Sequence, residues 1–108
     1  MTVFDYMSVT AKYNYSKMAV DITITTKSGF YNSIPSETSA GMFTGQVRFD
    51  GRLNTGQTGS TTVWADDNQT YSFSISSPDV PDSVTITVYA GYSKTGPLSE
   101  SESSNTGQ

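Results

Sequence analysis

The stretch Met18-Ala19-Val20-Asp21-Ile22-Thr23-Ile24-Thr25 alternates large apolar side chains with smaller or polar ones. Successive side chains of a β-strand point to opposite faces of a sheet, so this period of two predicts a strand with one buried face. Met18, Val20, Ile22 and Ile24 are the expected buried residues. Asp21 and the threonines are expected on the solvated face.

The same alternation recurs along the chain between short turn-forming segments. Residues that favour turns separate the alternating segments, for example at Asp50-Gly51 and Asn54-Thr55-Gly56. Parallel strands need long crossover connections, and no helical pattern lies between these segments. We therefore expect an all-β fold, an antiparallel β-sandwich of six to seven strands. The other expected strands are Val9–Tyr15, Phe43–Phe49, Thr61–Ala65, Tyr71–Ser76 and Val84–Ala90.

The composition supports the same fold class. The chain has 108 residues, with 17 Ser and 16 Thr but only two Leu. Such a composition favours strands and argues against a helical domain. We expect one domain over residues 1–98. Residues 99–108 contain no apolar side chain, so they are expected to form a polar tail or, alternatively, a weak last strand.

Charge and residue types exclude several functions. The net charge is −4 with six Lys+Arg, which leaves no basic stripe for nucleic acid. No apolar run approaches the ~18 residues of a membrane span. The chain has no Cys and no His, so it lacks a thiol nucleophile, an imidazole base and the usual zinc ligands. We expect no enzymatic activity and no cofactor.

The segment Val80–Ser101 resembles the end of a fibronectin type III or related immunoglobulin-like domain. In that family a penultimate strand alternates apolar residues into an Ala, and a Gly-containing hairpin and a Ser-rich last strand follow. The resemblance implies an immunoglobulin-like sandwich. It departs from the family at Val84, where a Tyr is frequent, and in the second strand, which lacks the usual Trp. The matching residues are Val84, Ile86, Val88 and Ala90, with Lys94-Thr95-Gly96-Pro97 as the hairpin.

One acidic loop is a candidate calcium site. Asp66, Asp67 and Asn68 are consecutive, and Asp79 and Asp82 lie in another connection. Calcium requires six to eight oxygen ligands, which loops at one end of a sandwich can combine. Asp and Asn are also the ordinary residues of turns. We favour that interpretation and assign no metal.

Two apparent loops are candidate contact surfaces. Asn32–Gly41 and Gly51–Ser60 are long and poor in apolar residues, and loops carry most binding residues on sandwich scaffolds. Arginine is favoured at protein interfaces. Four aromatic residues outside the main alternations, Phe4, Tyr6, Phe30 and Tyr31, are expected to cap the core or to form a contact patch. The candidate interaction residues are Arg48, Arg52, Asn54, Tyr31 and Trp64.

The leading functional hypothesis is a non-catalytic structural module of a virion. Small phage capsid decoration and tail proteins are similar in composition, and such a protein would bind and stabilise neighbouring subunits or present loops. Its partners would be capsid or tail proteins, with homo-oligomerisation as a further option. The alternative is an adhesin or carbohydrate-binding module of a bacterial cell-surface protein, which would be extracellular and could stack Tyr and Trp64 on sugar rings.

Overall fold

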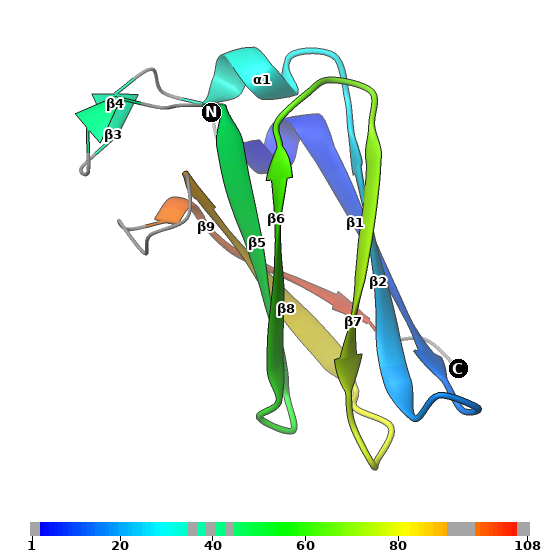
Figure 1. Ribbon diagram of the computed structural model, residues 1–108. Helices are drawn as coiled ribbons and strands as arrows, with labels where there is room; N and C mark the ends of the chain where they lie inside the picture. The colour runs from blue at the N-terminus through cyan, green and yellow to red at the C-terminus, as the bar shows by residue number, and fades with distance from the viewer. Residues whose placement is uncertain (1–2, 35–36, 39–40, 43–44, 91–96, 106–108) are drawn as a thin grey trace.

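The computed structural model describes residues 3–34, 37–38, 41–42, 45–90 and 97–105. Two antiparallel sheets face one another (Figure 1), which confirms the expected all-β, sandwich-like fold. The first sheet has the order β1-β2-β7, with β1 Met7–Asn14, β2 Ala19–Thr26 and β7 Thr70–Ser76. The second sheet has the order β6-β5-β8-β9, with β6 Thr58–Trp64, β5 Gln46–Leu53, β8 Ser83–Ala90 and β9 Pro97–Asn105.

Short elements lie at one end of the sandwich. A 3-10 turn, η1 (Val3–Tyr6), precedes β1, and the four-residue helix α1 (Phe30–Ser33) follows β2. Beyond α1, β3 (Glu37–Thr38) and β4 (Gly41–Met42) form a two-stranded ladder within the segment expected to be a loop. The described part of the chain has no helix of the length and hydrophobicity needed to cross a membrane.

The core lies between the two sheets and follows the expected alternation. Val20, Ile22 and Ile24 of β2 are fully buried and face the second sheet. Phe30 of α1 closes one end of this core, as expected for an aromatic cap, whereas Tyr31 remains exposed. The fully buried side chains of the second sheet are Val47, Phe49, Leu53, Val84, Ile86 and Val88.

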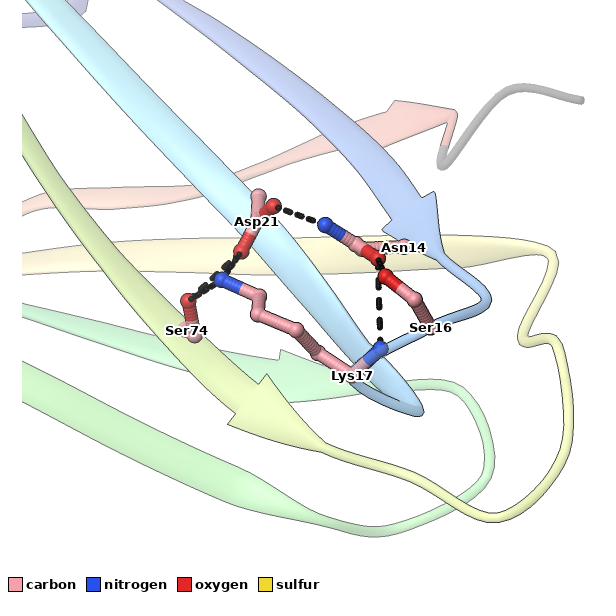
Figure 2. Close-up of polar contacts among 5 residues, drawn as sticks. All are labelled: Asn14, Ser16, Lys17, Asp21 and Ser74. Atoms are coloured by element: carbon pink, nitrogen blue, oxygen red, sulfur yellow. Dashed lines mark hydrogen bonds and ion pairs between the residues drawn. The ribbon is translucent and has the colours of Figure 1, made fainter.

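The prediction for the β1–β2 turn was wrong at two residues. Tyr15 and Met18 were expected on buried faces, but they are 64% and 52% exposed. Both lie in the turn, because the Asn14 side-chain oxygen accepts hydrogen bonds from Ser16 Oγ at 2.7 Å and Lys17 N at 3.2 Å (Figure 2). The turn ends at Met18 with φ 52°, a left-handed conformation. The strand alternation therefore begins only at Ala19.

The expected loop Gly51–Ser60 is largely a β-hairpin. Strand β5 continues to Leu53 and β6 begins at Thr58, so the turn itself is short. Leu53 N donates to Gln57 O at 2.9 Å and closes it. Arg52 is consequently a strand residue rather than a loop residue. Phe43, the expected start of this strand, lies outside the described residues.

The polar C-terminal segment runs along the edge of the second sheet. Residues 97–105 form β9, which pairs antiparallel with β8 from Ser83↔Asn105 to Tyr89↔Pro97. The register shifts at two places along this pair, between Ile86 and Val88 and between Val88 and Tyr89. Lys94, Thr95 and Gly96 of the expected hairpin lie outside the described residues.

Candidate functional site

An open groove of about 570 Å³ lies on the outer face of the four-stranded sheet. The groove runs over three adjacent strands, β6, β5 and β8, and its lining residues are all polar or charged apart from two glycines and the aromatic Tyr89. It is lined by Arg48, Asp50, Gly51, Arg52, Thr58, Gly59, Ser60, Thr85, Thr87 and Tyr89.

Two glycines form the backbone floor of this groove. Gly51 and Gly59 are direct partners in the β5–β6 ladder. A Cβ on either would point into the core and meet a side-chain atom of Ile75 at 2.9 Å. The absence of side chains here lets Ile75 of the facing sheet pack against the backbone of the second sheet. The hollow on the outer face therefore lies over the two glycines against which Ile75 packs from the other side.

A fixed arginine occupies one end of the groove. Arg48 donates to both carboxylate oxygens of Asp50, from Nε at 2.7 Å and from Nη2 at 3.3 Å. The Arg48 guanidinium also lies 4.6 Å from the centre of the Tyr89 ring. Only 11% of the Arg48 side chain is exposed, so the ion pair and the ring contact hold it in one orientation. The orientation of the Arg48 guanidinium at this end of the groove is thus fixed by contacts within the chain.

Arg52 provides an exposed cation at the other end. It lies on the same face as Arg48 and pairs with Thr58 on one side and Thr85 on the other. Among the described residues the Arg52 side chain makes no hydrogen bond and no ion pair, so its planar set of donors is available to a carboxylate or carbonyl of a partner. The hydroxyl groups beside it can donate or accept. The exposed guanidinium and the neighbouring hydroxyl groups together could bind a polar or acidic group of a partner.

The candidate calcium residues are engaged in bonds between loops. Asp67 accepts backbone N–H groups of Gly29 at 3.1 Å and Tyr31 at 2.8 Å, and these bonds lower the pKa of its carboxyl group, the Tyr31 bond most. Asn68 Nδ2 donates to Ser28 Oγ at 3.2 Å. Within the described residues no three acidic side chains gather in one place. The structure thus places Asp67 as an anchor for α1.

The other predicted interaction residues do not lie in the groove. Asn54 Oδ1 accepts hydrogen bonds from the backbone N–H groups of Asp82 at 2.8 Å and Ser83 at 3.1 Å, so it ties the β5–β6 turn to the start of β8. Trp64 and Tyr31 are exposed at the opposite end, where β6 ends near α1 (Figure 1).

Trp64 keeps its ring on the surface although its backbone is fixed. The side chain is 68% exposed, and its ring lies 3.3 Å from the point where a Cβ on Gly45 would be. The Trp64 carbonyl oxygen accepts a hydrogen bond from Tyr71 Oη at 2.9 Å. The ring therefore lies over Gly45, where a side chain would crowd it, and is otherwise largely open.

A polar cluster on the three-stranded sheet connects its strands through side-chain bonds. Lys17 Nζ lies 2.7 Å from Asp21 Oδ1, and Ser74 Oγ donates to the same oxygen at 2.7 Å (Figure 2). These bonds lower the pKa of Asp21, the Lys17 bond most. The cluster joins the β1–β2 turn to β2 and β7, and each polar group in it has a partner within the chain. The cluster therefore has a structural role, which is to hold the turn against the sheet.

Comparison of the chain with protein-family models, with curated proteins and with solved structures finds no match. The functional argument consequently rests on the groove and on the exposed side chains around it.

Proposed function

We propose that the protein is a non-catalytic structural module that binds neighbouring protein subunits, as a phage capsid decoration or tail component does, and that the outer groove is its contact surface. The observation that carries this proposal is Arg48, held by Asp50 and Tyr89 beside the exposed Arg52. Arg and Tyr are enriched in protein interfaces, and a preorganised arginine loses little side-chain entropy on binding.

We further propose that the sandwich is of the immunoglobulin-like kind. Two features support this assignment besides the resemblance in the sequence. The seven longer strands divide into sheets of three and four, and the chain crosses between the sheets after β2, β6 and β7. Crossing connections of this type characterise Greek-key sandwiches.

Reversing the charge of Arg52 tests the groove. In co-sedimentation with virus particles from the source of the protein, we expect Arg52→Glu to weaken binding at least tenfold. The reason is that a carboxylate replaces the exposed cation on which a partner's acceptors depend. Lys12→Glu is the matched control, because Lys12 is exposed on β1 and the charge changes equally. Lys12→Glu should bind like the wild type.

Two outcomes of this experiment count against the proposal. Equal binding of both variants would exclude the groove as the contact surface. Failure of the wild type to sediment with any particle would contradict the virion role itself.

The exposed Trp64 supports a second candidate function, carbohydrate binding. An indole ring that is 68% exposed can stack on a sugar face. On a glycan array, this function predicts a wild-type signal that Trp64→Ala abolishes and Tyr15→Ala, a control at another exposed aromatic residue, leaves unchanged. An array with no signal for the wild type would exclude this function and leave the structural module.

A further inference from the structure

Strand β6 is an edge strand with unused backbone hydrogen-bonding groups. At the two ends of the β5–β6 pair, Leu53 N donates to Gln57 O and Ala65 N donates to Gly45 O. These bonds show that the backbone N–H and C=O groups of the odd-numbered residues of β6 point toward β5. The backbone groups of successive residues point to opposite sides of a strand. Ser60 and Thr62 therefore direct their N–H and C=O groups away from the sheet. Tyr71 Oη reaches the carbonyl of Trp64 from that same side.

The β6 edge lacks the features that usually protect an edge from pairing. It contains no charged residue and no proline, and its ladder with β5 has no register shift. The other edges of the described strands differ. Strand β1 carries Lys12, the Lys17–Asp21 pair lies against Ser74 of β7, and the ladder of β9 is irregular. Among the described edge strands, β6 is therefore the one best able to pair with a further strand.

We propose that β6 pairs with β6 of a second copy of this chain, antiparallel about a two-fold axis through Thr61. Of the registers that match the outward-facing residues, this one pairs all seven residues of the strand. Ser60 then bonds to Thr62 of the second copy, and Thr58 lies opposite Trp64. The two four-stranded sheets become one continuous eight-stranded sheet.

The side chains of the strand fit this pairing. Thr58, Ser60, Thr62 and Trp64 share the outer face, since they pair with the outward residues of β5. Trp64 of one copy lies over Thr58 of the other, next to Arg52, which pairs with Thr58 in its own sheet. The exposed indole and the exposed guanidinium can thus form a cation–π contact. Because both residues of this contact belong to the chain itself, it favours a second copy, rather than an unrelated strand, as the partner that pairs with β6.

Light scattering after size exclusion, across a range of protein concentrations, tests the dimer. We expect the wild type to shift from monomer to dimer as concentration rises. The double variant Ser60→Lys/Thr62→Lys places lysines directly opposite each other in the proposed register and should raise the dimer Kd at least tenfold. Thr70→Lys/Ser72→Lys is the matched control on the exposed face of β7 and should dimerise like the wild type.

Two further measurements do not require the lysine variant to fold. Trp64 is the only tryptophan, so its emission should shift to shorter wavelength as the dimer forms. In this Cys-free chain, Thr61→Cys should give a disulfide-linked dimer on oxidation, since residues 61 of the two copies would form a close non-hydrogen-bonded pair. Ser72→Cys should not. A monomer at all concentrations, or a dimer unaffected by the lysines at 60 and 62, would overturn the proposal.

These measurements use the purified protein alone, so their results do not depend on whether a virion subunit binds the groove. Failure of dimerisation is therefore distinguishable from failure of the groove to bind a partner.

Discussion

Replacing Phe49 by alanine is expected to lower the free energy of unfolding by about 3–5 kcal/mol. Phe49 is fully buried in the middle of β5. Its ring centre lies 6.4 Å from that of Phe30 in α1 and 5.9 Å from that of Tyr71 in the facing sheet. The side chain thus joins both sheets and the cap of the core. Its removal leaves a cavity where three elements meet.

Urea denaturation followed by circular dichroism measures this effect. Single domains commonly have about 5–15 kcal/mol of stability, so the variant should be close to unfolding at physiological temperature. Phe49→Leu, which keeps most of the apolar volume, should lose distinctly less. Tyr15→Ala removes an aromatic side chain that is 64% exposed and loses its edge-to-face contact with Tyr13, so it should cost about 0.5–1.5 kcal/mol. A Phe49→Ala variant as stable as Tyr15→Ala would show that the core is not centred on this ring.

The strands were predictable because alternation is a local property of the sequence. Val84, Ile86 and Val88 are fully buried, as the period of two indicated. The same rule fails where the chain leaves the sheet. Met18 continues the apolar alternation, but a side-chain bond from Asn14 closes the turn and places Met18 outside the strand. Alternation predicts which side chains of a strand are buried and which are exposed. The hydrogen bonds of the turn determine where the strand ends.

The extension of β5 was not predictable because its cause lies in another strand. Asp50-Gly51 has the composition of a turn. In the structure Gly51 is a strand residue without a side chain because Ile75 of the facing sheet occupies that space. A glycine required by a distant neighbour has the same local appearance as a glycine required by a turn.

The candidate site was found only in part for a related reason. Arg48 and Arg52 were chosen because they lie near an apparent loop, and the structure places both on one sheet face beside a groove. Asp50 could have been included, since residues two apart share a face of a strand. Tyr89 could not, because its place beside Arg48 depends on the register of β5 with β8. Register is a property of two segments that lie far apart in the sequence.

Replacing Thr26 by valine is expected to lower the free energy of unfolding by about 2 kcal/mol. The Thr26 side chain is buried at the end of β2. Its hydroxyl donates to Asp66 O at 2.8 Å and accepts from Gln69 N at 2.9 Å. Valine has the same shape but cannot form either bond, so the two part-buried bonds to the Asp66 carbonyl and the Gln69 N–H are lost.

The effect of this substitution should also extend to α1. Thr26 fixes the loop that carries Asp67, and Asp67 accepts the backbone N–H groups of Gly29 and Tyr31. We therefore expect faster hydrogen exchange at those two amides in Thr26→Val. Thr25→Val is the matched control, because Thr25 is exposed and its substitution should cost less than about 0.5 kcal/mol. Equal stability of the two variants would mean that water replaces the lost bonds, and unchanged exchange at Gly29 and Tyr31 would mean that Asp67 is held independently of Thr26.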